Sequence, residues 1–314
     1  MKKETVAVSL HIFANFVTPF GTAANNRAET EGNIATLQKL IWQGQPHSTV
    51  SAEAIRFALR RRLAGAERTG TNRRWNEDDR LNEWQDWKFQ GWHSDDGKTF
   101  IDDDLLGFMT AEASKEEGEA GSANVRRAVL EVTRAISLTP WPGDVTFNAA
   151  SPGAASSAQK KGTNPVPYGT EVHATRYQYG IALTPERLRD KTRAAKAVEA
   201  LCALGTVAGN HGRFLFDFCP DSLVFRLTAD PAPRLLYCYR STDEGRSVDA
   251  PDLLARVEDG DIEAKELILG GPFALSATGQ RLKALGAFVG EKPGVKAAAA
   301  EAVRRINGKL GIEG

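Results

Sequence analysis

Cysteine, long apolar runs and net charge are all scarce in this 314-residue sequence, and each shortage excludes a class of protein. The three cysteines, Cys202, Cys219 and Cys238, are far apart and form no C-x-x-C pair. This excludes a disulfide framework and a cysteine zinc site, and predicts small buried side chains. No apolar run reaches the roughly 18 residues that would span a membrane. The apolar stretch near the N-terminus is interrupted by Glu4, His11 and Asn15 and lacks a cleavage site, so we expect a cytoplasmic protein.

Catalytic patterns are equally scarce. The five histidines show no H-x-x-x-H spacing, and neither a G-x-S-x-G motif nor a P-loop is present. Asp102, Asp103 and Asp104 offer adjacent carboxylates that suit Mg²⁺, but acids in this position suit a helix N-terminus equally well. We therefore predict no catalytic residues, no metal site and no cofactor. A metal-dependent ribonuclease that uses the aspartate cluster is the enzymatic alternative.

Zero net charge hides two opposed blocks. Residues 56–74 contain seven arginines and one acid, a net charge of about +6, whereas residues 75–104 contain ten acids and three bases, about −7. Either block alone fits a solvated surface. Together they suggest one patch for a polyanion and another for a basic surface on a second copy.

The arginine-rich segment 51–63 has the features of a helix. Ser51 is a suitable N-cap, Val50 can pack on Ile55, and Glu53 suits the positive end of the helix dipole. Apolar residues recur at helical spacing on one face, whereas Arg56 and Arg60 lie one turn apart and can reach the same target. That target is either solvent or an anion.

Alternation and capping patterns predict the other elements. We expect a strand over 5–16 with one buried face, and a second helix or buried segment over 124–138. A strand over 174–183 is followed by a long helix that begins after Thr184 at Pro185. Further strands are predicted at 213–218 and 222–228, with a closing helix over 294–308. Without its insertions, the order strand, helix, strand, helix, strand fits an α+β, split βαβ (ferredoxin-like) core.

Two segments have the composition of insertions. Residues 64–124 are charged and contain Trp75, Trp84, Trp87 and Trp92, which suit an anchored irregular subdomain better than stacking platforms for bases. Residues 141–169 are rich in Gly, Ser, Pro and Ala and predict a long exposed hairpin or loop, with Lys160 and Lys161 near its tip.

Several motifs occur together in a recognisable order: "NNRAETEGN", "VSAEAIRFALR", "DDDLLGFM", "YQYGIAL" and "GNHGRFLFDFCPDSLVFRLT". Between about residues 5 and 285 the chain resembles the guide-RNA-binding backbone subunit of type I CRISPR Cascade complexes, closest to the DevR-like group of subtype I-B. The resemblance implies a modified RRM/ferredoxin-like palm (1–63, 125–139 and 173–314), an inserted helical fingers subdomain (64–124) and a protruding thumb hairpin (140–172).

The resemblance also implies the contacts with RNA. Its guide-backbone contacts fall on Asn25, Asn26, Arg27, Ser51, Arg56 and Arg60, while the hairpin with Lys160 and Lys161 covers the guide; His173 and Arg176 complete the expected RNA-binding set. Contact with phosphate and sugar leaves base edges free, as a subunit that holds any spacer requires. The helix 51–63 is then expected to face phosphates.

The partners implied are CRISPR RNA, the target DNA strand paired to it, further copies arranged head to tail, and other Cascade subunits at the filament ends and along the belly. No membrane is involved, and the expected location is the prokaryotic cytoplasm. The fitting function is a non-catalytic structural subunit. A monomeric RRM-like RNA-binding protein is a third possibility beside the ribonuclease.

Overall fold

The computed structural model describes residues 9–27, 29–94, 97–112, 122–150 and 166–312. A large mixed sheet has the strand order β21-β20-β17-β1-β16-β12-β6-β5, with β11 also paired to β16. Its strands are β1 (His11–Val17), β5 (Lys39–Trp42), β6 (Gln45–Val50), β11 (Leu130–Val132), β12 (Ala135–Ser137), β16 (Tyr177–Leu183), β17 (Ser222–Thr228), β20 (Leu267–Gly270) and β21 (Phe288–Val289). Pairing is antiparallel except between β20 and β21.

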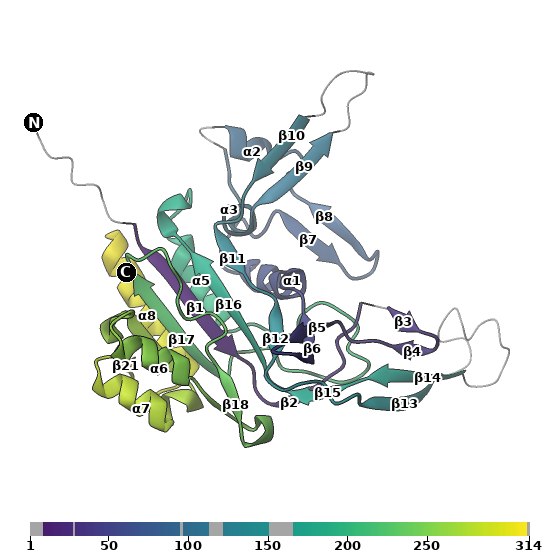
Figure 1. Ribbon diagram of the computed structural model, residues 1–314. Coiled ribbons are helices and arrows are strands. Elements are labelled where there is room, and N and C mark those ends of the chain that lie inside the picture. The colour runs from purple at the N-terminus through teal and green to yellow at the C-terminus, as the bar shows by residue number, and fades with distance from the viewer. Residues whose placement is uncertain (1–8, 28, 95–96, 113–121, 151–165, 313–314) are drawn as a thin grey trace, which may run out of the picture.

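Helices cover both faces of this sheet (Figure 1). Ile12, Ala14 and Phe16 of β1 enter one core with α1 (Ala52–Leu63), α5 (Arg193–Leu201) and α8 (Val295–Leu310). Phe13 and Val17 enter a second core with the C-terminal helices α6 (Pro251–Glu258) and α7 (Ala277–Ala284). The prediction of a single buried face for the first strand is therefore wrong, and the strand begins at His11 within the described residues.

A buried polar ladder closes the second face. Asn15 Nδ2 donates to Gln178 Oε1 at 3.1 Å, and Gln178 Nε2 donates to the carbonyl of Tyr239 at 3.0 Å. The backbone N–H of Tyr237 donates to Asn15 Oδ1. Segment 235–239 therefore covers the second face of the sheet where β1 and β16 pair.

Residues 64–94, 97–112 and 122–126 project beside α1 as an arm built mainly of hairpins (Figure 1). It contains β7 (Arg73–Asn76), β8 (Leu81–Trp84), α2 (Gln90–His93), α3 (Ile101–Leu106), β9 (Phe108–Glu112) and β10 (Ser122–Arg126). The insertion was predicted to be helical, and its described residues contain two short helices beside four strands. Asn76 Oδ1 accepts the N–H groups of Asp78 and Asp79, and this Asx turn joins β7 to β8.

A second arm projects near the N-terminal end of β16, whereas the first arm lies near its C-terminal end (Figure 1). Here β13 (Val145–Ala150) pairs antiparallel with β14 (Val166–Glu171), which also pairs with β4 (Ile34–Ala35); β3 (Thr30–Glu31) completes the sheet. The predicted hairpin over this region is thus confirmed in its two strands. Near its base β2 (Gly21–Ala23) pairs with β15 (His173–Thr175), and elsewhere β18 (Arg240–Thr242) pairs with β19 (Ser247–Asp249).

Three other predicted elements differ in the structure. Residues 124–138 form parts of β10, β11 and β12, not a helix, because their backbone pairs with neighbouring strands. Residues 213–218 alternate in burial but form no strand; Phe216 and Phe218 pack against Tyr177 without a ladder partner in the described sheets. The long helix expected after Thr184 is only the turn η1 (Pro185–Arg187) followed by α5.

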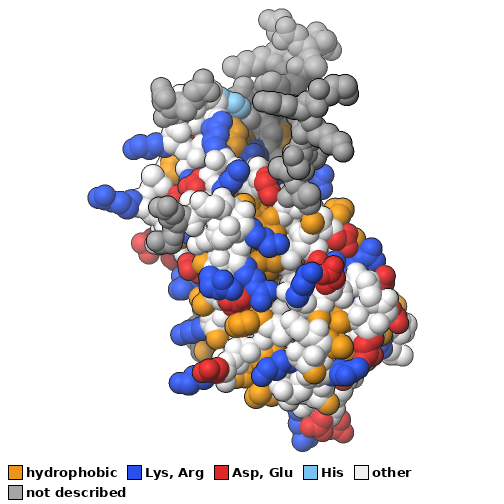
Figure 2. Space-filling model, turned by 90° about the vertical axis from the view of Figure 1, so that its left-hand side faces the viewer, with side chains coloured by type: hydrophobic (Ala, Val, Ile, Leu, Met, Phe, Trp, Pro, Cys, Tyr) orange, Lys and Arg blue, Asp and Glu red, His pale blue; other side chains and the backbone are white. Residues whose placement is uncertain are grey.

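The predicted strands at β16 and β17 and the helices α1 and α8 are confirmed. Short turns η2 (Asp243–Gly245), η3 (Ala264–Glu266) and η4 (Pro272–Leu275) complete the C-terminal part. Among the described residues, no helix is both long and apolar enough to cross a membrane. On the face seen in Figure 2, lysine and arginine side chains are interspersed with acidic ones.

Candidate nucleic-acid interface

A surface groove runs between α1, the β7–β8 hairpin, loop 206–211 and the loop after β2. It comprises three adjoining hollows of about 270, 260 and 520 Å³ that share Phe57 and Arg73. Arginine outnumbers acid along its walls: Arg27, Arg60, Arg61, Arg73 and Arg74 against Glu53 and Glu77. A groove with this excess of guanidinium groups attracts a polyanion.

Loop 206–211 is held in place by the asparagines of the predicted site. The backbones of Asn26 and Asn210 form reciprocal 2.9 Å hydrogen bonds, and Asn25 Nδ2 donates to the carbonyl of Ala208 at 3.0 Å. A Cβ at Gly209, whose φ is +130°, would lie 2.1 Å from Asn25 Oδ1. Asn25 and Asn26 are mostly buried, and they hold loop 206–211 at the side of the groove. Arg27 is exposed and lines the groove wall.

Ser51 also lines the groove, and its hydroxyl caps α1. Its Oγ accepts the N–H of Ala54 at 3.2 Å, as expected for an N-cap. The buried stripe of α1 is Ile55, Ala58, Leu59 and Leu63, as the periodicity predicted. Burying this stripe leaves Phe57 and Arg61 on the groove side.

Arg56 and Arg60 lie together, as their spacing predicted, and both reach the segment around α3. An Arg56 guanidinium nitrogen (Nη2) donates to the carbonyl of Leu106, and Arg60 Nε donates to Asp102 Oδ2 at 3.1 Å. Burial, followed by the charge of Arg60, lowers the pKa of Arg56, although an arginine remains protonated at neutral pH. Arg60 also lines the groove, and the phosphate contact of both residues stays a prediction.

Asp102 and Asp103 lie directly beneath the groove. Asp102 accepts the backbone N–H groups of Asn72 and Arg73 at 2.7 and 3.2 Å, besides Arg60. Asp103 accepts Asn72 Nδ2 at 2.9 Å. Burial, assisted by the charge of Asp102, raises the pKa of Asp103 to about 7. Asp102 thereby fixes the start of β7, from which Arg73 and Trp75 reach the groove.

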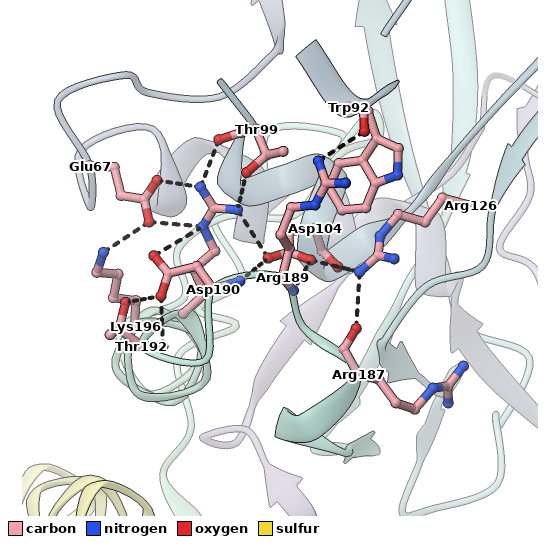
Figure 3. Close-up of polar contacts among 11 residues, drawn as sticks. Glu67, Trp92, Thr99, Asp104, Arg126, Arg187, Arg189, Asp190, Thr192 and Lys196 are labelled. Carbon is pink, nitrogen blue, oxygen red and sulfur yellow. Dashed lines mark hydrogen bonds and ion pairs between the residues drawn. The ribbon is translucent and has the colours of Figure 1, made fainter. Parts of the chain in front are cut away.

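Asp104 binds elsewhere, in a buried junction between the first arm and α5 (Figure 3). It accepts Arg193 Nη1 at 3.0 Å, Arg126 Nη2 at 2.6 Å, and the backbone N–H groups of Arg189 and Asp190. Because these two N–H groups bind the carboxylate, residues 188–190 do not continue a helix from η1.

Asp102 and Asp103 thus share Asn72 as a partner, whereas Asp104 is bonded to Arg126 and Arg193. No group of three or more His, Cys, Asp or Glu side chains able to hold a metal ion occurs among the residues the structure describes. The Mg²⁺ arrangement that the ribonuclease alternative requires does not form among the described residues. Instead, Asp102 and Asp104 connect the first arm to α1 and α5.

Two further predicted RNA contacts differ in burial, since His173 is buried and Arg176 is half-buried. His173 is 1% exposed, with Nδ1 bonded to Ser48 Oγ and Nε2 to Thr139 Oγ1, and burial lowers its pKa to about 4. Arg176 donates to Asp221 Oδ2 and to three backbone carbonyls. Both side chains make internal contacts. The assignment of buried His173 to RNA does not fit its position, whereas the RNA contact of Arg176 stays a prediction. Lys160 and Lys161 lie outside the described residues.

The sequence interpretation missed Arg61, Arg73 and Trp75 as members of the groove. Arg73 and Trp75 are two residues apart on β7, so their side chains lie on the same face of the hairpin. Phe57 and Arg61 are one turn apart on α1. The sequence signal that could have identified these residues is an arginine and an aromatic residue at strand spacing, 73 and 75, beside an aromatic residue and an arginine at helical spacing, 57 and 61. Among the tryptophans, Trp92 anchors the arm as predicted, with Arg126 and Arg189 stacked 4.1 and 4.5 Å from its ring centroid.

Comparisons with known proteins agree with this architecture. Residues 18–202, more than half of the chain, match the family model "CRISPR-associated negative auto-regulator DevR/Csa2". A Myxococcus xanthus (strain DK1622) protein, "CRISPR-associated protein Cas7/Cst2/DevR", is 64% identical over 265 residues, which cover 84% of this chain and 87% of the relative.

Solved structures with little sequence identity share the fold. One chain described as "CRISPR RNA-guided surveillance complex" superposes with a TM-score of 0.53 at 15% identity, covering 93% of this chain and 99% of its own. Another, from a "pre-nicking" surveillance complex, gives a TM-score of 0.50 at 12% identity, covering 94% and 100%. With the family model and the Myxococcus relative, these findings establish that the chain belongs to the DevR/Csa2 family of CRISPR-associated proteins.

Proposed function

We propose that this chain is the guide-RNA-binding backbone subunit of a type I Cascade complex, of the subtype I-B branch. The observation that carries the proposal is the arginine-lined groove beside the N-terminus of α1, in a chain of the DevR/Csa2 family. Several copies line up head to tail on one CRISPR RNA, which they hold for pairing with target DNA, while other Cascade subunits bind at the filament ends and along the belly. The protein acts in the prokaryotic cytoplasm.

The strand order supports a modified RRM-like palm. β17, β1, β16 and β11/β12 correspond to the order 4-1-3-2 of a split βαβ unit, with α1 and α5 as its two helices. The arm of residues 64–124 is then the fingers, and the β13–β14 arm, within 140–172, is the thumb. Since both sheet faces are covered, the guide runs along the groove at the edge of the palm and not across the sheet.

The role we assign to the protein is structural and not catalytic. The aspartates of the ribonuclease alternative are hydrogen-bonded to internal partners, which supports this assignment. Guanidinium groups that bind phosphate retain any spacer sequence equally well, as a subunit repeated along the guide requires.

The test is RNA binding by the double variant Arg61→Ala/Arg73→Ala across several spacer sequences and salt concentrations. Loss of two phosphate contacts should weaken binding to every spacer alike and reduce the slope of log K against log salt by about 1.4, the value for a single strand. Arg127→Ala is the matched control, because Arg127 is exposed and lies outside the lining of the groove. An effect confined to some spacers would contradict phosphate contact. The variant Arg56→Ala/Arg60→Ala tests the two arginines predicted from sequence in the same way.

A further inference from the structure

Part of the groove wall is aromatic, and its rings carry no positive charge for a phosphate. Trp75 is 37% exposed and meets Phe57 at 6.3 Å between ring centroids with an interplanar angle of 74°. Both rings line the two hollows of about 270 and 520 Å³. The other tryptophans of this arm are absent from the lining of these hollows: Trp84 packs on Trp87 and Phe89, and Trp92 lies between arginines.

Polar groups surround the two rings. Arg61 lies over Phe57, 6.0 Å from the ring centroid, and Arg73 enters the same hollows from the strand that carries Trp75. Asn82 stands directly opposite Trp75 in the β7–β8 register, so the two side chains share one face of the hairpin. Trp75 Nε1 donates to Glu77 Oε2 at 3.1 Å, which leaves the polar edge of the indole bonded within the protein.

We propose that this cluster, Phe57, Arg61, Trp75 and Asn82, is a binding site for one nucleobase of the RNA in the groove. An aromatic ring and a guanidinium group both stack on the π-face that every base has, so the site accepts any base. The amide of Asn82 offers a donor and an acceptor for the edge of the stacked base. The arginines place a ribose–phosphate backbone next to the rings, which is why the occupant is a nucleotide and not an apolar peptide.

This inference rests on the proposed function and adds a contact that is insensitive to salt. Binding through phosphates releases counterions and weakens as salt rises, whereas stacking releases none. A site of this kind holds the RNA in register along the groove while leaving the phosphate contacts independent of sequence.

The experiment compares a short single-stranded RNA with the same ribose–phosphate backbone carrying abasic nucleotides. Trp75→Ala should weaken binding of the intact RNA by about tenfold, with an unchanged salt slope, and should alter binding of the abasic RNA by less than about twofold. Trp75→Phe should retain most of the affinity, because a ring remains. Trp87→Ala is the matched control: Trp87 is 60% exposed on the same arm but outside the hollows.

Three results would overturn the inference. Equal losses for intact and abasic RNA would make Trp75 a structural or protein-contacting residue. No loss for intact RNA, with wild-type binding preserved, would leave the rings without a base. A wild-type protein that binds neither RNA would contradict the proposed function itself, and the inference with it. Circular dichroism of each variant separates these results from loss of folding.

Discussion

Arginine serves opposite purposes in the two regions that border the first arm. At the junction between the first arm and α5, Arg193 is buried between Asp104 and Glu67, with contacts at 3.0 Å to each. In the groove, Arg61 is 64% exposed in its side chain and lies 3.8 Å from the equally exposed Glu77. Burial alone would lower the pKa of Arg193, but its hydrogen bonds with Glu67 and Asp104 raise it overall. The Arg61 guanidinium is instead solvated by water.

The difference between the two regions explains how a neutral chain presents a basic groove. Acids of the negative block neutralise arginines from inside the fold, as Asp104 does at the junction and Asp102 beneath the groove. The opposed charge blocks therefore meet partly within one subunit, and are not wholly reserved for contact between copies. The arginines that outnumber the acids along the groove are then the charges available to a polyanion.

The largest effect should come from removing the carboxylate at the junction. Asp104→Ala leaves Arg193 and Arg126 without this partner and two backbone N–H groups without their acceptor. The free energy of unfolding should fall by about 3–5 kcal/mol, as measured by urea denaturation. Glu131→Ala, which removes an exposed partner of Arg127, is the control and should cost about 0.5 kcal/mol or less. Equal costs for the two variants would erase the distinction between the regions.

A second prediction concerns pH and Asp103. Because burial raises the pKa of Asp103 to about 7, the folded state keeps this proton between pH 4 and 7 while the unfolded state releases it. Its contribution to stability is complete below pH 4 and is lost as pH rises through 7. Asp103→Asn should remove a slope of about −1.4 kcal/mol per pH unit across that interval. Parallel stability–pH curves for wild type and variant would show that Asp103 ionises normally.

The smallest effect on stability should come from the groove. Arg61→Ala should change the free energy of unfolding by about 0.5 kcal/mol or less, because its ion pair is exposed to water. The same substitution should nevertheless weaken RNA binding. Urea denaturation of this variant measures its stability, and RNA titration measures its affinity. A stability loss comparable to that of Asp104→Ala would show that Arg61 is a structural residue and not a free groove arginine.

Elements with strong local patterns were predictable from sequence. The N-cap Ser51 and the stripe ending at Leu63 fixed α1, and the small-residue helix α8 and the strands β16 and β17 followed from periodicity. Elements decided by distant partners were not. Residues 188–190 leave the helical path because Asp104, some 85 residues earlier in the chain, binds their N–H groups.

Only some of the residues predicted to contact RNA line the candidate groove. The 25–27 loop and α1 do border the groove, as the motifs indicated. His173 and Arg176 carry polar groups typical of RNA contacts, but only the tertiary structure decides that Ser48, Thr139 and Asp221 engage them. Conversely, Trp75 was indistinguishable from the anchoring tryptophans until the hairpin placed it against Phe57.

Native mass spectrometry of the protein with CRISPR RNAs of increasing spacer length tests the central claim most directly. A backbone subunit should give complexes with several copies per RNA, and the number of copies should rise with spacer length. One copy per RNA at every length would contradict the account and leave a monomeric RNA-binding protein, and no bound RNA would remove the RNA-binding function altogether.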